Sequence, residues 1–267
     1  MKQISILGCG WLGIPLAKSL IEKSFLIKGS TTSLEKVSVL ETKGILAFQI
    51  EVGETEIKGE INSFLENSEI LIIDIPPKLR SVSSENFVKK IETLIPFIEK
   101  STLQKVIFVS STSVYTDDNS IITENTTPNP SSESGKQLFE AENLLQNNLN
   151  FKTTIIRFGG LIGENRHPIH FLTGRQNLEN ANGPINLIHL TDCISIIEKI
   201  IEQDYFGETF NAVTPFHPTR NDYYTQKATE LNLPLPKFND DKPSVGKTIL
   251  STKIETVLQY KFQNISL

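Results

Sequence analysis

The sequence has few cysteines, no excess of basic residues and no long apolar run. Its two cysteines, Cys9 and Cys193, are far apart, and the apolar stretch before Cys9 is shorter than that of a secretory signal. Isolated cysteines of this kind indicate a reducing compartment, so we expect a cytoplasmic protein without a disulfide framework. The 31 acidic residues outnumber the 26 basic ones and give a net charge of −5, which argues against nucleic acid or a membrane surface as partner. No apolar run is long enough to cross a bilayer.

The sequence also lacks the residue clusters of a metal site and of a nucleoside triphosphate site. His167 and His170 are three residues apart, but Pro168 lies between them and no carboxylate or cysteine cluster accompanies them. Residues 246–248 resemble only the second half of a P-loop, because Asp241 stands where its first glycine is required. We therefore expect neither a metal ion nor a nucleoside triphosphate.

What the sequence does contain is a glycine-rich turn near its start. The apolar residues 4–7 lead into Gly8, Gly10 and Gly13, and leucines and isoleucine at helical spacing follow. Strand, turn and helix in this order form the dinucleotide-binding fingerprint GxGxxG. Its glycines permit the tight turn, the approach of a pyrophosphate and close helix packing, and the helix start binds phosphate. The alternative is a glycine turn that binds nothing. The predicted cofactor contacts in this turn are Gly8, Gly10, Trp11, Leu12 and Gly13.

No carboxylate follows the second predicted strand, residues 25–29. An NAD site usually has Asp or Glu about twenty residues past the glycines, where it bonds the ribose 2′-hydroxyl. Here residues 30–33 read Ser-Thr-Thr-Ser, and Lys28 and Lys36 are nearby. These hydroxyl and amino groups would tolerate the 2′-phosphate of NADP. We predict NADP as the cofactor, with NAD as the alternative; the non-binding interpretation is a turn that caps a helix over residues 34–41. The predicted contacts in this stretch are Thr31 and Thr32.

Further apolar runs predict strands over residues 44–50, 69–75 and 105–109, with a helix over residues 84–100. A strand as apolar as residues 70–73 belongs inside a parallel sheet that is covered on both faces. The sequence thus predicts an α/β protein with a Rossmann-type, doubly wound parallel sheet. Ligands of such sheets bind at the carboxyl ends of the strands. The predicted cofactor contacts at these ends are Ile75, Pro76 and Ser110.

Segments from residue 110 onward share motifs with one enzyme family. The matching segments are residues 110–115 (Ser-Ser-Thr-Ser-Val-Tyr), 123–130 (with Glu124 and Pro-Asn-Pro), 155–163 (with Arg157), 186–192 (with His189 and Asp192) and 210–213. In these segments the sequence resembles the extended short-chain dehydrogenase/reductase family, which includes NAD-dependent epimerases and dehydratases. Residues 163–168 and 217–220 resemble its YeeZ-like group of atypical members. The resemblance covers essentially the whole chain.

The sequence departs from this family at the position of the family's catalytic pair. The family's Tyr-x-x-x-Lys falls on Ser134 and Leu138. A serine hydroxyl is a much weaker acid than a phenol, and leucine brings no cation to lower its pKa. Lys136 is two residues from the lysine position and is expected on the other face of the helix, toward solvent. The candidate catalytic residues are Ser111, which polarises the substrate oxygen in the family, and Tyr115.

The resemblance also implies a small C-terminal substrate lobe. The predicted lobe comprises residues 159–185 and 215–267, and the predicted dinucleotide-binding core comprises residues 1–158 and 186–214. Basic residues after the sixth strand favour a small anionic or polar substrate. The predicted substrate contacts are Arg157, Arg166 and His167.

These observations favour an NADP-preferring oxidoreductase, or a relative of the sugar-nucleotide epimerases, with an acid/base that is not the family's usual one. The alternative is a dinucleotide-binding protein without turnover that reports the nicotinamide redox state to a partner. Ser111, Arg157 and a full lobe favour the enzyme, whereas the loss of both tyrosine and lysine favours the alternative. We expect a monomer or homodimer that binds a small molecule.

Overall fold

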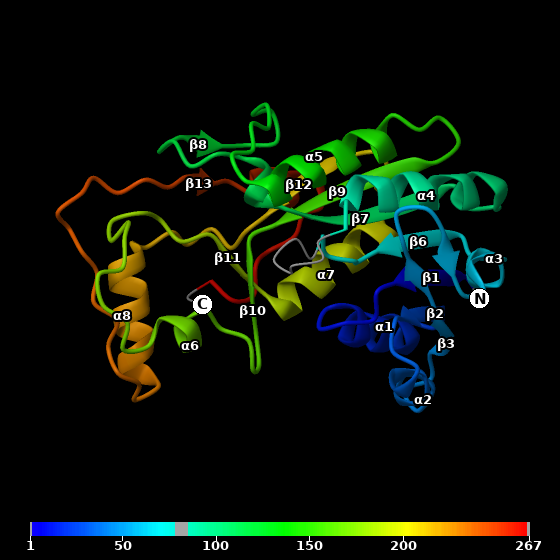
Figure 1. Ribbon diagram of the computed structural model, residues 1–267, viewed down its shortest axis with the longest axis horizontal. Coiled ribbons are helices and arrows are strands. Elements are labelled where there is room, and N and C mark those ends of the chain that lie inside the picture. Colours follow the sequence, from blue (N-terminus) through cyan, green and yellow to red (C-terminus); the bar gives the residue numbers. More distant parts are fainter. Residues whose placement is uncertain (1, 78–84, 266–267) are drawn as a thin grey trace.

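The computed structural model describes residues 2–77 and 85–265. Within these residues, seven parallel strands form one sheet in the order β12-β9-β7-β6-β1-β2-β3 (Figure 1). Strands that progress outward from β1 in both directions are the mark of a doubly wound sheet, so the predicted fold class is confirmed. The strands are β1 (Gln3–Leu7), β2 (Leu26–Thr31), β3 (Leu46–Gln49), β6 (Ile70–Ile73), β7 (Lys105–Ser111), β9 (Lys152–Phe158) and β12 (Thr209–Ala212).

Helices cover both faces of the sheet. One face packs against α1 (Gly13–Glu22), α2 (Glu35–Glu41) and α7 (Leu190–Glu202), and the other against α3 (Ile61–Leu65), α4 (Phe87–Lys100) and α5 (Glu133–Gln146) (Figure 1). In β6, Ile70 and Ile72 join the first layer, whereas Leu71 and Ile73 join the second. Because successive side chains of a strand point to opposite faces, this apolar strand is buried on both sides.

A smaller body lies at one end of the molecule (Figure 1). Its apolar cluster, separate from the two core layers, includes Ile169, Tyr223 and Tyr224. The chain leaves the sheet for this body through β10, after β9, and returns through β11, and these two strands pair in a separate parallel sheet. The elements concerned are α6 (Ile169–Leu172), α8 (Arg220–Glu230), β10 (Gly160–Ile162) and β11 (Leu187–His189).

The C-terminal segment returns to the core. In α9 and the residues after it, Ile254, Leu258, Tyr260 and Phe262 are buried in the first core layer. The predicted lobe of residues 215–267 therefore extends too far, because these apolar side chains pack against the sheet. The elements here are α9 (Thr252–Val257) and β13 (Thr248–Ile249), which pairs with β8 (Ile121–Ile122).

Most observed boundaries lie within a few residues of the predicted ones. β7 continues past the predicted residues 105–109 to Ser111. The predicted start of the long helix at Ser84 lies outside the described residues, and α4 begins at Phe87. None of the described helices has the length and apolar character needed to span a bilayer. The remaining short elements are β4 (Glu51–Val52), β5 (Ile57–Lys58) and the 3-10 helix η1 (Thr112–Val114).

Candidate functional site

The glycine turn between β1 and α1 is closed on the sheet side and open on the other. Gly8 has a φ of 110°, and a Cβ there would lie 2.3 Å from the carbonyl oxygen of Asp74. A Cβ on Gly13 would lie 2.4 Å from the carbonyl oxygen of Gly8. Around the Cβ position of Gly10, by contrast, no described atom lies within 4 Å. The turn therefore leaves open the side from which a pyrophosphate would approach.

The N-terminus of α1 faces this opening. Leu12 occupies its N-cap position and its side chain makes no capping hydrogen bond, and the first turn contains no acidic residue. The first N–H groups of a helix lack intrahelical partners and carry a partial positive charge. The start of α1 is thus suited to an anionic ligand.

A cavity of about 180 Å³ lies at the carboxyl ends of β1 and β2. The Ser30 hydroxyl oxygen accepts a hydrogen bond from the backbone N–H of Gly8, at 3.0 Å, and ties the glycine turn to β2. The cavity brings together predicted contacts from three segments that are distant in the sequence. These are Gly8, Thr31, Thr32, Ile75 and Pro76.

The basic residue that lines this cavity is neither Lys28 nor Lys36, the two that the sequence indicated. Lys28 points toward α3, where its amino group donates to the carbonyl oxygens of Ser63 and Glu66 at 2.6 and 2.7 Å. Lys28 is therefore unavailable to a 2′-phosphate, and the expectation that Lys28 would help to accommodate this group was wrong. Lys90 of α4 lines the cavity instead, paired with Glu85.

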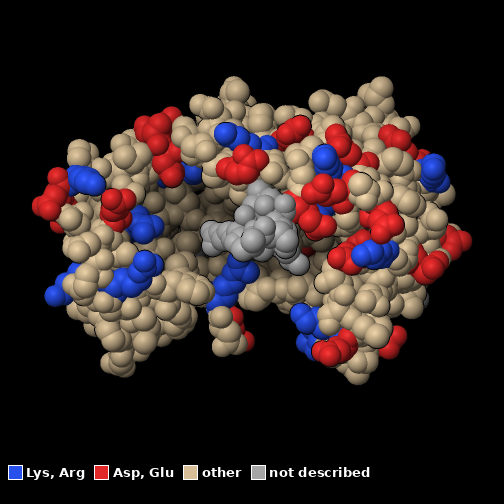
Figure 2. All heavy atoms as spheres, in the orientation of Figure 1, with Lys and Arg blue, Asp and Glu red and all other residues tan. Residues whose placement is uncertain are grey.

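A second cavity, of about 320 Å³, adjoins the first through Ile75 and Pro76. It continues along the carboxyl edge of the sheet toward β7. In the space-filling view, the molecule is hollowed between the lobe on the left and the core on the right (Figure 2). Predicted site residues that line this second cavity are Gly10, Trp11, Leu12, Ile75, Pro76, Ser110, Ser111 and Arg166.

Ser111, the last residue of β7, lines the second cavity. Its hydroxyl oxygen accepts a hydrogen bond from the N–H of Ser113 at 3.1 Å, which caps η1. The hydroxyl hydrogen therefore remains available to a ligand. The neighbouring Ser110 donates its hydroxyl hydrogen to Glu142 of α5, at 2.5 Å, inside the core.

Tyr115 and Arg157 lie outside this cavity, in a buried polar network. The Tyr115 hydroxyl accepts a hydrogen bond from Arg157 at 2.5 Å and donates one to Asn211 at 3.0 Å. Arg157 is paired with Glu142 across 2.6 Å, and both side chains are almost fully buried. Burial raises the pKa of Tyr115, which disfavours its phenolate. Both side chains are therefore engaged in the core and do not line the cavity at which they were expected.

The α5 residues at the family's Tyr–Lys positions provide no ionisable replacement. Ser134 is half-buried, and Leu138 is buried and lines the second cavity. Lys136 is exposed, as its position on the helix predicted. A Cβ on Gly135 would lie 2.3 Å from the carbonyl oxygen of Ser113, so α5 packs directly onto η1. At this end, the cavity thus has a hydroxyl from Ser111 and an apolar wall from Leu138.

Arg166 and His167 are neighbours in sequence but have different surroundings. The exposed Arg166 lies over the Trp11 ring, 4.6 Å from its centre, at the mouth of the second cavity. His167 Nδ1 accepts a hydrogen bond from the N–H of Ile169 at 3.1 Å, and Nε2 lies 2.8 Å from the Tyr223 hydroxyl. Burial lowers the pKa of His167 to about 4. His167 is thus a neutral packing residue of the lobe that lines neither of the two cavities, and its substrate contact stays a prediction.

Asp74 is a site residue that the sequence reasoning missed. It follows β6 directly and lines the second cavity. Burial raises the pKa of its carboxyl group to about 7, and the N–H of Gly13 and the charge of Arg166 act in the opposite direction. The available signal was an acidic residue at the end of an otherwise apolar strand, on the edge where ligands bind.

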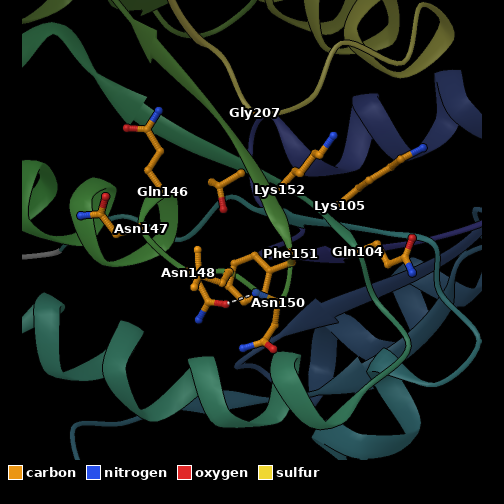
Figure 3. Close-up of a pocket in the computed structure, with 11 residues that line it drawn as sticks. Gln104, Lys105, Gln146, Asn147, Asn148, Asn150, Phe151, Lys152 and Gly207 are labelled. Atoms are coloured by element: carbon orange, nitrogen blue, oxygen red, sulfur yellow. Dashed lines mark hydrogen bonds between the residues drawn. The ribbon is translucent and has the colours of Figure 1, made fainter.

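A larger cavity, of about 710 Å³, lies at the opposite edge of the sheet (Figure 3). It is lined by Lys105 and Lys152, the first residues of β7 and β9, and by several side-chain amides. Three of these amides, those of Gln146, Asn148 and Asn150, already have partners. The Asn148 side chain accepts from the N–H of Asn150, drawn in Figure 3, and donates to Glu99. Since ligands of open parallel sheets bind at the carboxyl edge, we place the site at the two adjoining cavities. Among the described residues, no group of three His, Cys, Asp or Glu is arranged to hold a metal ion.

No family model matches the chain. Protein YeeZ of Escherichia coli K12 is 32% identical over 266 residues, which cover 98% of this chain and 96% of that protein. UDP-glucuronic acid 4-epimerase from Bacillus cereus, solved with UDP-glucuronic acid and NAD, superposes with a TM-score of 0.82 at 17% identity. UDP-glucose 4-epimerase from Thermotoga maritima, solved with UDP-glucose, superposes with a TM-score of 0.81 at 14% identity. Each of these two alignments covers 98% of this chain and 94% of the other. The chain therefore shares the fold of the sugar-nucleotide epimerases and belongs to the YeeZ family.

Proposed function

We propose that the chain binds a nicotinamide dinucleotide across the two adjoining cavities and acts as an NADP-preferring oxidoreductase or sugar-nucleotide epimerase-type enzyme. The observation that carries this proposal is the open side of Gly10, at the start of α1, which faces the second cavity; this cavity adjoins the first through Ile75 and Pro76. A bound nicotinamide supplies a hydride acceptor or donor.

The residues along this edge fit such a cofactor from end to end. The N–H groups at the start of α1 would hold the pyrophosphate. Thr31 and Thr32 would contact the adenosine end, and Ile75 and Ser110 the nicotinamide end. The Bacillus cereus epimerase with the same fold was solved with NAD, which supports this assignment.

We propose NADP as the preferred cofactor because β2 ends in hydroxyl residues and Lys90 lines the adenosine-end cavity. Lys90 would exchange its partner Glu85 for the 2′-phosphate. NAD is the alternative cofactor. The observation that favours NAD is the presence of two carboxylates, Glu51 and Glu85, in the same cavity.

The proposed substrate is a small molecule with an anionic group, of which a sugar nucleotide is one kind. Ser111 would donate its hydroxyl hydrogen to the reacting substrate oxygen, and Arg166 at the mouth of the cavity would attract the anionic group. The acid/base differs from that of the extended family, because Leu138 replaces the lysine and the Tyr115 hydroxyl is held by Arg157 and Asn211.

The leucine at position 138 and the engaged hydroxyl of Tyr115 also support a second candidate function. In that function the chain is a dinucleotide-binding protein without turnover that reports nicotinamide redox state. No phenol–ammonium pair is found among the described residues that line the second cavity. A protein that senses the cofactor needs the glycine turn but no acid/base.

One experiment separates these functions. Trp11 is the sole tryptophan of the chain and lines the second cavity, so quenching of its fluorescence by NADPH or NADH measures binding at this site. NADPH and NADP turnover is then followed across a panel of carbonyl compounds and UDP-sugars. Binding with turnover supports the enzyme, binding without turnover supports the sensor, and no quenching by either dinucleotide refutes both.

A further inference from the structure

Asp74 is held rigidly between the glycine turn and the second cavity. Its backbone N–H donates to the carbonyl oxygen of Leu7 at 2.8 Å, and its own carbonyl oxygen abuts Gly8. Its carboxyl oxygen Oδ2 lies 3.4 Å from the position that a Cβ of Gly13 would take. The carboxyl group is thus fixed at the start of α1, beside the amides that would hold a pyrophosphate.

Three titratable groups face this carboxyl from the elements around it. They are Cys9 of the glycine turn, Cys193 of α7 and Arg166 of the segment after β10. Burial raises the pKa of both thiols, that of Cys9 to about 12, so both are neutral. Arg166 is therefore the one charged group among them, and it is also exposed and stacked on Trp11.

A pyrophosphate bound at the start of α1 would place negative charge next to Asp74. Two anions that share a desolvated site cannot both remain ionised without a large energetic cost. The carboxyl can avoid this conflict, since burial has already raised its pKa to about 7. Near neutral pH it takes up a proton readily.

We propose that Asp74 contacts the bound dinucleotide as a neutral carboxylic acid that donates a hydrogen bond to the pyrophosphate, so that binding takes up one proton from solvent. This inference rests on the proposed dinucleotide binding. No covalent bond forms or breaks, and the proton returns to solvent when the dinucleotide leaves. Asp74 is then a binding residue that favours the complex at low pH.

The test uses NADH, because the 2′-phosphate of NADPH itself titrates at about pH 6. Titration calorimetry at pH 8 in two buffers of different protonation enthalpy counts the protons taken up. We expect close to one for the wild-type protein and none for Asp74→Asn. NADH affinity, followed by Trp11 fluorescence, should fall by about tenfold per pH unit above pH 7 and level off below it.

The matched control is Glu164→Gln, which removes an exposed carboxylate from the same hairpin as Arg166. It should keep the proton uptake and the pH dependence of the wild-type protein. Asp74→Asn should bind NADH equally at pH 6 and pH 8.5, and more tightly than the wild-type protein at the higher pH. Affinities that do not change with pH, with no proton taken up, would overturn the inference and leave the proposed function standing. No NADH binding by any variant at pH 6 would overturn both.

A measurement without cofactor tests the same carboxyl. The ordinary pKa of Asp is about 4, so in the unfolded chain the group ionises at lower pH than in the folded protein. The folded state loses relative stability as pH rises from about 4 to about 7. Asp74→Asn should therefore raise the melting temperature more at pH 8 than at pH 4.5. An equal effect at both pH values would contradict the raised pKa of Asp74, on which the inference depends.

Discussion

The guanidinium of Arg166 lies over the indole ring of Trp11, with its central carbon 4.6 Å from the ring centre. This contact joins the segment after β10 to the glycine turn, two regions that are about 150 residues apart. It places a cation at the mouth of the cavity that contains Asp74 and Ser111. The charge of Arg166 lowers the pKa of Asp74, and its position is the one from which we propose that it attracts an anionic ligand.

Replacing Arg166 with glutamine should change the pH dependence of NADH binding. The positive charge of Arg166 lowers the pKa of Asp74, so its loss should raise that pKa and move the fall in NADH affinity to higher pH. The measurement is NADH fluorescence from pH 6 to pH 9. Arg175→Gln, an exposed arginine of the lobe, is the control and should leave the midpoint in place. An unchanged midpoint in Arg166→Gln would show that the two charges do not interact.

Gly10→Val should abolish dinucleotide binding while leaving the fold intact. The added side chain would point into space that no described residue occupies, so it would fill the path of the pyrophosphate without striking the part of the chain that the structure describes. Calorimetry with NADPH should show a loss of at least 100-fold in affinity, about 2.7 kcal/mol, with a nearly unchanged melting temperature. Gly10→Ala adds less bulk and should lose less. Wild-type affinity in the valine variant would refute the role assigned to the turn.

Thr32→Asp should reverse the preference for NADP. Thr32 is exposed and lines the adenosine-end cavity, so a carboxylate there would repel the 2′-phosphate and accept a hydrogen bond from the ribose hydroxyl. Lys90→Gln should weaken NADPH binding and spare NADH binding. Dissociation constants for both dinucleotides provide the check. If the wild-type protein already favours NAD by tenfold, about 1.4 kcal/mol, the proposed NADP preference is incorrect.

Ser111→Ala should reduce any turnover by about 100- to 1000-fold, the typical effect of removing one donor to a developing oxyanion. Ser134→Ala should have little effect, because its hydroxyl is a poor acid and Leu138 provides no cation. Rates of NADPH oxidation with carbonyl and sugar-nucleotide substrates test both variants. The double variant Ser134→Tyr with Leu138→Lys restores the family pair and should raise turnover of simple carbonyl substrates. Turnover that disappears in Ser134→Ala and survives in Ser111→Ala would contradict this assignment.

Glu142→Ala should destabilise the fold because it leaves the buried charge of Arg157 without its partner. The expected loss is about 3–5 kcal/mol in the free energy of unfolding by urea. Glu69→Ala is the control, since it breaks the exposed Lys2–Glu69 pair and should cost at most about 1 kcal/mol. A stable Glu142→Ala protein with a raised KM would instead indicate that Arg157 contacts substrate.

Local patterns along the chain were enough to predict the sheet, the glycine turn and the missing catalytic pair. These features depend on local patterns: the apolar run of residues 70–73, the spacing of Gly8, Gly10 and Gly13, and the alignment that places Leu138 at the lysine position. Such patterns encode secondary structure directly, because each depends on neighbouring residues along one strand, turn or helix.

Which polar side chains face the cavity, by contrast, depends on how distant segments pack together. Motif matching put Tyr115 and Arg157 at the site, but Glu142 and Asn211, from other elements, hold both in the core. Asp74 was overlooked for the same reason, since its environment is made by the glycine turn and by segments more than 80 residues away. The ionisation and reach of a side chain depend on what packs against it, and that is set by long-range contacts that no local pattern records.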